Sequence, residues 1–257
     1  MKKKTRGKLA EIIKVRINER IINTVIGGMA SGKTFETKKV IERYIKKFPK
    51  EKVLILDSSD EYTEYKEVAI DKIGTIKKPS RIKVSNDNMS DVAKAVMYNF
   101  KHGLLVIEGY SDFAFNYFDL SSLTACNRTK DIDVIVIKKD IRSMPINVIE
   151  NTSVFRVHKS SIDFSLLRAI DKTHISPTIT VAFHAMLNNK SRFSFCYFDA
   201  LGDVVVGAKK ADVIHGCFEF LRPTVEAFAR SIVKYKPVGK IVQVSDIPVK
   251  KIIKKRK

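Results

Sequence analysis

Short runs of consecutive apolar residues recur through the first 160 residues of the chain, separated by more polar stretches. They predict strands at residues 21–26, 53–56, 104–107, 134–137 and 154–157, and residues 81–84 predict a further short strand. Four of these runs are continuous and do not alternate between apolar and polar positions. Continuous apolar runs are typical of parallel strands that are covered on both faces.

Between these strands the apolar positions recur at helical spacing. Residues 33–48 predict a first helix, which Pro49 ends. Residues 91–100 and 120–127 predict two more helices. Helices that connect parallel strands form right-handed crossovers and cover both faces of the sheet. The pattern therefore predicts an α/β fold, a three-layer α/β/α sandwich around a mainly parallel central sheet.

The pattern changes after about residue 160. Residues 193–198 and 204–206 predict a hairpin, and helical spacing is found at 163–171, 178–187 and 211–235, the last interrupted near Pro223. We therefore expect four parts in the chain. They are a basic N-terminal arm at 1–20, the α/β core at 21–160, an α+β extension packed on the core at 161–235, and a basic tail at 236–257.

The charge of the chain bears on its partners more than on its fold. Its 257 residues include 48 Lys and Arg against 28 Asp and Glu, a formal net charge of +20. Nucleic acid is the leading candidate for a partner, because each phosphate that a cation neutralises releases a counterion. A Lys-rich surface that simply faces water is the alternative.

The sequence lacks two kinds of pattern, metal-binding or disulfide spacings of Cys and His and long apolar runs. The three cysteines lie far apart without CxxC spacing, and the five histidines are scattered, so neither disulfides nor a zinc site is expected. No run approaches the ~20 apolar residues that cross a bilayer. We expect a protein without a transmembrane segment in a reducing compartment, the cytoplasm.

One segment carries a specific chemical signature, the pattern G-x-x-x-x-G-K-[ST] of a phosphate-binding loop. Glycines let successive backbone amides turn inward on one anion, and the helix that follows points its N-terminal amides at the same phosphates. Lys33 is expected to reach the β and γ oxygens of ATP or GTP, and the Thr34 hydroxyl to bind Mg²⁺. The nucleotide-binding residues are predicted to be Gly27, Gly28, Met29, Ala30, Ser31, Gly32, Lys33 and Thr34.

A second acidic group is expected at the end of a neighbouring strand. P-loop ATPases hold the metal with an acidic residue there, and the apolar run at 104–107 ends in Glu108. We interpret Glu108 as a metal ligand and catalytic residue; a strand-end surface residue is the alternative. Many such ATPases place a second acid directly afterwards to polarise the attacking water, but this chain has Gly109.

Several segments together resemble the FtsK–HerA superfamily of DNA-pumping P-loop ATPases, most closely the packaging or morphogenesis ATPases of phages and zonula-occludens-toxin-like proteins. After the second strand, Asp57-Ser58-Ser59-Asp60-Glu61-Tyr62 is similar to the family's Asp-x-x-x-Glu-Tyr element. Residues 127–136 resemble its Arg-containing helix end and sensor strand, and residues 143–157 resemble a proline, short helix and strand that follow. The resemblance covers residues 20–160.

The resemblance implies an ATP-hydrolysing DNA translocase that acts in viral genome packaging or virion morphogenesis. It implies a homo-oligomer, a hexameric ring, with DNA and a capsid or portal-vertex protein as partners, in the host cytoplasm or associated with the virion. An arginine from one subunit would face the next subunit's γ-phosphate. Arg128 fits that role best, with Arg142 and Arg156 as further candidates. Lys138, Lys139 and Arg142 are expected on a loop that contacts DNA phosphates.

The chain departs from the family pattern in two places. The family usually has Gln just after the sensor strand, where this chain has Lys138 and Lys139, and the paired acid after Glu108 is missing. Glu61 could supply a catalytic carboxylate, and Lys138 could pair with phosphate charge. Two other functions therefore stay open: a nucleotide-binding assembly protein with little turnover, and a small-molecule kinase.

Overall fold

The computed structural model describes residues 20–109, 117–139, 141, 144–159, 186, 191–200, 204–209, 211–213, 234–236 and 242–243. These residues fall into two compact units. The core unit comprises residues 20–26 and 32–152, and the C-terminal unit comprises residues 27–31 and the described residues from 153 onward.

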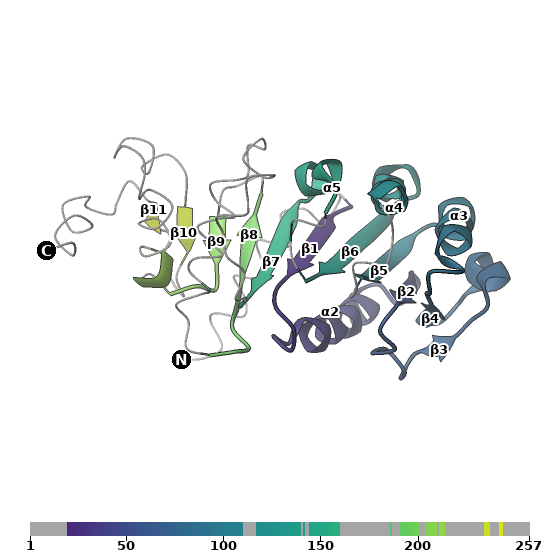
Figure 1. The fold of residues 1–257 in the computed structure, drawn as a ribbon, viewed down its shortest axis with the longest axis horizontal. Coiled ribbons are helices and arrows are strands. Elements are labelled where there is room, and N and C mark those ends of the chain that lie inside the picture. The colour runs from purple at the N-terminus through teal and green to yellow at the C-terminus, as the bar shows by residue number, and fades with distance from the viewer. Residues whose placement is uncertain are drawn as a thin grey trace, which may run out of the picture. The chain divides into compact units, whose positions relative to one another are not determined.

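The core unit contains a six-stranded sheet in which every pairing is parallel (Figure 1). Its order is β1-β6-β5-β2-β4-β3. The strands are β1 (Ile22–Ile26), β2 (Lys52–Asp57), β3 (Lys66–Glu67), β4 (Ser80–Lys83), β5 (Gly103–Gly109) and β6 (Ile132–Lys138). All strands predicted for this part of the chain are present, and β3 is an addition at the edge.

Helices cover both faces of this sheet. The helix α2 (Lys33–Lys47) lies on one face, and α3 (Met89–Asn99), α4 (Tyr117–Thr129) and α5 (Ile146–Asn151) lie on the other (Figure 1). A short 3₁₀ helix, Ile70–Thr75, packs beside α3. The three-layer α/β/α sandwich predicted from the sequence is confirmed. None of the helices in the described part of the chain is long and apolar enough to span a membrane.

The continuous apolar runs are explained by burial from both sides. Every residue of β1 and β5 is buried. On the α2 face, Ile41 of the helix packs with Val25, Val106 and Ile137 of three strands. Removing these side chains from water is the main favourable term for this unit, at roughly 25 cal/mol per Å² of apolar area. The same packing fixes where each strand ends, and so positions the residues that follow.

The C-terminal unit is a mixed sheet. Its strands are β7 (Val154–His158), β8 (Phe195–Asp199), β9 (Val204–Val206), β10 (Lys234–Lys236) and β11 (Val242–Gln243). The predicted hairpin is confirmed, because β8 and β9 pair antiparallel, and β8 also pairs antiparallel with β7. The rings of Phe155 and Phe198 stack across β7 and β8 with centroids 5.8 Å apart.

The predicted helix at 211–235 is wrong at its end. Residues 211–213 are helical, but Tyr235 lies in a strand and pairs with Val205 in a parallel ladder. Pairing with an apolar strand outweighs the local helical spacing, and tyrosine favours a pleated, half-buried surface. Val242–Gln243 pairs with β10 inside the segment predicted as a basic tail. The predicted helices at 163–171 and 178–187 lie outside the described residues, apart from the helical Met186.

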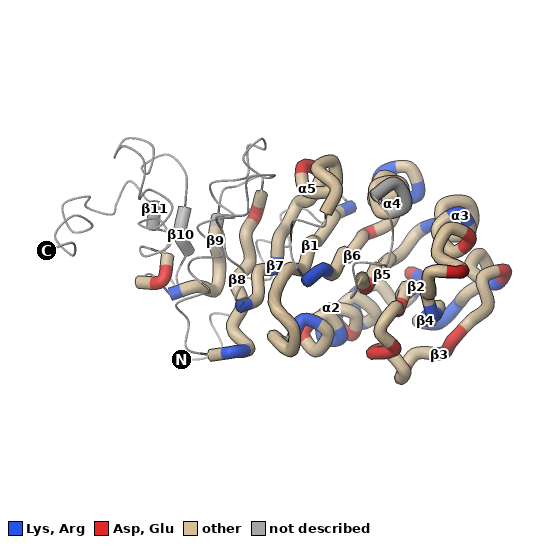
Figure 2. Tube along the Cα trace, viewed as in Figure 1, with Lys and Arg blue, Asp and Glu red and all other residues tan. Residues whose placement is uncertain are grey.

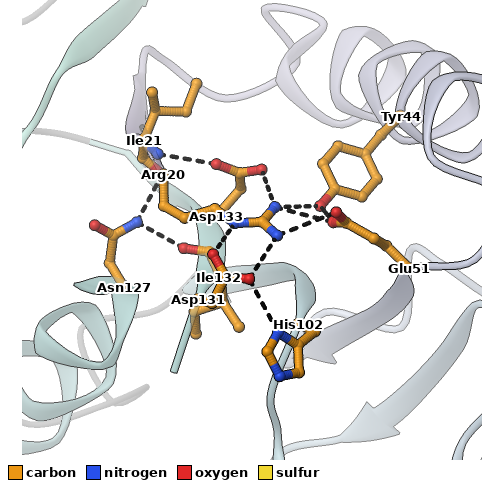
Figure 3. Close-up of polar contacts among 9 residues, drawn as sticks. All are labelled: Arg20, Ile21, Tyr44, Glu51, His102, Asn127, Asp131, Ile132 and Asp133. Atoms are coloured by element: carbon orange, nitrogen blue, oxygen red, sulfur yellow. Dashed lines mark hydrogen bonds and ion pairs between the residues drawn. The ribbon is translucent and has the colours of Figure 1, made fainter. Parts of the chain in front are cut away.

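The amino-terminal ends of β1 and β6 are tied together by one guanidinium group, that of Arg20 (Figure 3). Its Nε donates to Asp131 Oδ1 at 2.6 Å, and its Nη1 donates to Glu51 Oε2 at 2.9 Å and to Asp133 Oδ2 at 3.2 Å. Tyr44 of α2 donates its hydroxyl to the same Glu51 carboxylate. Arg20 closes the sequence segment predicted as an arm, yet its side chain is bound to the core unit.

We expect Arg20→Met to lower the free energy of unfolding by about 1–3 kcal/mol, because it leaves Glu51, Asp131 and Asp133 close together without their cation. Urea unfolding at pH 7 measures the change. Arg43→Met is the matched control, because Arg43 is an exposed arginine of α2 whose only described side-chain hydrogen bond goes to the Lys39 carbonyl. Equal denaturation midpoints for the two variants would contradict a role of Arg20 in holding the strand ends.

Candidate functional site

The phosphate loop, residues 27–34, leaves the carboxyl end of β1 and runs into α2. Its backbone turns twice through the left-handed region, with φ of 52° at Ala30 and 86° at Gly32. No side chain caps the first turn of α2, where Gly32 is the N-cap residue. The first amides of a helix have no partner within it, so they are placed to bind an anion.

The loop is held on one side by the end of β7. A Cβ on Gly27 would lie 2.5 Å from the His158 Cβ, so a side chain at this position does not fit. The His158 ring hydrogen-bonds through Nδ1 to the Ser31 carbonyl at 3.0 Å, and the Gly28 amide donates to the Lys159 carbonyl at 3.2 Å. His158 is fully buried. Sequence reasoning missed this histidine, because its contact joins residues 127 positions apart.

Ser31 supplies an observation that points to a ligand. Its side chain is 2% exposed, and its Oγ has no hydrogen-bond partner among the described residues. A buried hydroxyl without a partner costs about 1–3 kcal/mol. Phosphate oxygens held by the surrounding amides would supply the missing acceptor. The loop therefore fits the nucleotide that its sequence pattern predicts.

Glu108 lies at the carboxyl end of β5 and is 2% exposed. The Tyr62 hydroxyl donates to its Oε2 at 2.7 Å. Burial raises the pKa of Glu108 to about 7. The hydrogen bond from Tyr62 and the positive charge of Lys33 lower this pKa, and the negative charge of Glu61 raises it further. Lys33 and Glu108, predicted separately from the sequence, are thus within electrostatic reach of each other.

Asp57 holds Tyr62 in this position. Asp57 is fully buried at the end of β2, directly beside Glu108 in the sheet register. Its carboxylate accepts the amides of Glu61 at 3.2 Å and Tyr62 at 3.0 Å, and a guanidinium bond from Arg81 at 3.0 Å. The Asp-x-x-x-Glu-Tyr element therefore has a physical basis. The aspartate builds the turn, and the tyrosine reaches the carboxylate on the next strand.

Two solved structures that align with most of this chain are a viral NTPase and a viral ATPase. The genome packaging NTPase B204 from Sulfolobus turreted icosahedral virus 2, in complex with ATP-gammaS, aligns with a TM-score of 0.59 and 15% identity over 75% of this chain and 98% of that chain. The DNA-packaging ATPase B204 from Sulfolobus turreted icosahedral virus aligns with a TM-score of 0.54 and 16% identity, over 75% and 98%.

The chain has a P-loop NTPase fold. At this level of identity the likeness establishes the fold and not the activity. The resemblance predicted from the sequence is confirmed to that extent. No protein-family profile matches the chain, and no curated protein matches it in sequence.

Three further residues predicted to act in catalysis, Glu61, Arg128 and Arg156, lie in different parts of the structure. Glu61 is exposed next to Tyr62, and its charge reaches Glu108. Arg128 is exposed in the last turn of α4, shortly before β6 begins. That position is the amino-terminal edge of the parallel sheet, opposite the phosphate loop, so Arg128 cannot reach the loop of its own chain. Arg156, another candidate arginine, is fully buried in β7 and cannot project to a neighbour.

Lys138 and Lys139 do not share one environment. Lys138 was expected on an exposed loop, but it is the last residue of β6 and is 5% exposed. Its side chain lies across Gly109 on the adjacent strand β5, where a Cβ built on Gly109 would lie 2.9 Å from the Lys138 Nζ. Lys139 is exposed and stays a predicted DNA contact, and Arg142 lies outside the described residues.

The raised pKa of Glu108 makes stability depend on pH. A carboxyl whose pKa rises from 4.5 in the unfolded chain to about 7 in the folded chain favours folding only while it is protonated. The nucleotide-free protein is therefore expected to lose up to about 3 kcal/mol of stability from this group as pH rises from 4.5 to 8. In Glu108→Gln that loss should be absent. Urea unfolding at several pH values measures the difference between the two proteins.

Two neighbouring substitutions should move the same transition in opposite directions. Tyr62→Phe removes a hydrogen bond that favours the ionised carboxylate, so the transition should shift to higher pH. Glu61→Gln removes a repelling charge, so the transition should shift to lower pH. A pH dependence that is identical in all four proteins would show that Glu108 does not titrate in this range.

Proposed function

We propose that this protein is an ATP-hydrolysing DNA translocase that acts in viral genome packaging or virion morphogenesis. One observation carries the proposal: the phosphate-loop lysine, Lys33, and the buried Glu108 lie within electrostatic reach of each other at the carboxyl edge of a parallel sheet. The fold likeness to B204, named as a genome packaging NTPase, supports the same assignment.

The chain's own residues account for nucleotide binding. The amides of the phosphate loop and the Lys33 ammonium neutralise the phosphates, and the Ser31 hydroxyl gains a partner. Thr34 and Glu108 would hold Mg²⁺, which screens the charge of the β and γ phosphates when bound. Tyr62 keeps the Glu108 carboxylate turned in one direction through its 2.7 Å hydrogen bond. Glu108 must be ionised to act, so activity should rise as pH passes about 7.

The distribution of charge supports a polyanionic partner. Residues 20–152 carry 22 Lys and Arg against 18 Asp and Glu, and both signs are mixed over the described elements (Figure 2). Residues 153–257 carry 19 against 8, and residues 1–19 carry 7 against 2. The excess positive charge therefore belongs mainly to the segments before residue 20 and after residue 152. We assign DNA phosphate contact to those segments, together with Lys139 and Arg142.

The position of Arg128 supports an oligomer. Arg128 lies at the edge of the sheet opposite its own phosphate loop, so a role at a γ-phosphate requires a second copy of the chain. A closed ring satisfies that requirement for every subunit. We assign a hexameric ring, with a capsid or portal-vertex protein as the structure it serves, in the host cytoplasm or on the virion.

A second function is favoured by one observation. Gly109 occupies the position at which a second acid would polarise water, so turnover has no evident general base there. A nucleotide-binding assembly protein with little turnover would need only the loop and Glu108. In that protein ATP would order the oligomer without being consumed at a rate that drives transport.

The test measures phosphate release with and without double-stranded DNA, together with the mass of the particle with ATP present. A translocase should show DNA-stimulated hydrolysis and form a ring.

Lys33→Ala should abolish hydrolysis, because the cation on the β and γ oxygens is lost. Lys46→Ala, an exposed lysine in the last turn of α2, is the matched control and should keep full activity. Tight ATP binding without DNA-stimulated release would instead support the assembly protein, and full activity of Lys33→Ala would contradict both.

A further inference from the structure

Arg81 of β4 is a buried arginine that binds three carboxylates. Its residue surface is only 9% exposed. Its Nη1 donates to Asp57 Oδ2 at 3.0 Å and also to Asp60, and its Nη2 donates to Glu67 Oε2 at 2.9 Å. Asp57 ends β2, Asp60 lies in the turn that follows, and Glu67 belongs to the edge strand β3. One guanidinium group therefore connects three segments of the chain on this side of the sheet.

The strand register places Arg81 on the face of the sheet that α2 covers. Arg81 is the register partner of Ile55 on β2, and Ile55 packs in the same apolar cluster as Ile41 of α2. Side chains alternate between the two faces along a strand, so Asp57, two residues after Ile55, lies on this face as well. Glu108 is the register partner of Asp57. Arg81, Asp57 and Glu108 thus share the face of the helix into which the phosphate loop runs.

A short series of contacts connects Arg81 to the Glu108 carboxylate. Arg81 forms an ion pair with the fully buried Asp57, and the same Asp57 oxygen accepts the Tyr62 amide at 3.0 Å. The guanidinium therefore stabilises the charge that organises the turn before Tyr62. The Tyr62 hydroxyl donates to Glu108 Oε2 at 2.7 Å. This hydrogen bond fixes the rotation of the carboxylate group and leaves Oε1 as the oxygen for a metal ion or its bound water.

We propose that Arg81 is a positioning residue of the magnesium site, which acts through Asp57 and Tyr62 to orient the Glu108 carboxylate toward the metal of a bound nucleotide. The inference rests on the proposed function, in which Thr34 and Glu108 hold Mg²⁺. Groups that hydrogen-bond to a metal ligand orient it, and their loss weakens metal binding by roughly 10- to 100-fold. Arg81 acts one contact further out, and it lies outside the motifs from which the sequence predicts this site.

The test measures how much Mg²⁺ strengthens ATP-gammaS binding to the full chain. Calorimetry gives this magnesium ratio, the dissociation constant in EDTA divided by that in saturating Mg²⁺. At about pH 8.5 the Glu108 carboxyl is ionised, so its protonation does not enter the comparison. Arg81→Met should lower the magnesium ratio by roughly tenfold and leave binding in EDTA almost unchanged. Lys83→Met is the matched control, because it removes the same charge from an exposed side chain at the end of β4, and it should not change the ratio.

A double-mutant cycle tests whether Arg81 acts through the tyrosine hydroxyl. Tyr62→Phe should lower the magnesium ratio by a similar factor, and Arg81→Met should add little further loss in the Tyr62→Phe background. Losses that multiply in the double variant would overturn the inference, because Arg81 would then act by another route. A lower melting temperature of Arg81→Met with an unchanged magnesium ratio would also overturn it, because the role of Arg81 would then be structural alone.

Arg81→Lys is the second variant, should Arg81→Met not fold, because it keeps a cation beside the buried Asp57. A single ammonium lacks the planar fork that bonds Asp57 and Glu67 together, so the magnesium ratio should still fall. In that case an unchanged ratio in Arg81→Lys overturns the inference. If the native protein binds no ATP-gammaS, or gains nothing from Mg²⁺, the proposed nucleotide site itself fails. If the native protein gains from Mg²⁺ and Arg81→Met keeps that gain, only this inference fails.

Discussion

Parallel pairing in the core unit is the constraint on which the rest of the structure depends. Because parallel strands all end at one edge, the phosphate loop, Glu108 and Lys138 come to that edge from three neighbouring strands. The register then decides which side chains are neighbours, and it places Asp57 beside Glu108 and Gly109 beside Lys138. A shift of one residue would turn each side chain to the other face of the sheet. The strand register therefore determines which side chains meet at the carboxyl edge of the sheet.

The two edges of this sheet hold charge in different ways. At the amino-terminal edge, Arg20 is surrounded by carboxylates that hydrogen-bond to it, and the group holds the chain together. At the carboxyl edge, burial sets the protonation of Glu108, whose pKa is raised to about 7. A group that is neutralised by its neighbours contributes to stability, whereas a group kept near its titration point is ready to respond to a ligand.

The sequence predicts the core unit well because its signals are local. An apolar run covered on both faces has few alternatives to a buried parallel strand, and the glycine pattern of the phosphate loop defines its own turn. The failures involve distant contacts. Lys138 comes at the end of an apolar run, and a charged residue there predicts an exposed loop. It is buried because its side chain lies in the space that a side chain at Gly109 would occupy. Tyr235 has helical spacing locally, but a ladder with Val205 decides its conformation. The support of the phosphate loop by His158 has no local signal.

The titration of Glu108 near neutrality also affects how occupancy of the site is measured. A carboxyl that is partly protonated at pH 7 must give up its proton before it can ligate a divalent cation. If Glu108 ligates the metal as proposed, uptake of magnesium nucleotide would then release a fraction of a proton to the buffer. The heat of binding would include the ionisation enthalpy of that buffer. The apparent affinity for the metal would fall as pH falls, because the metal ion takes the place of the proton on Glu108.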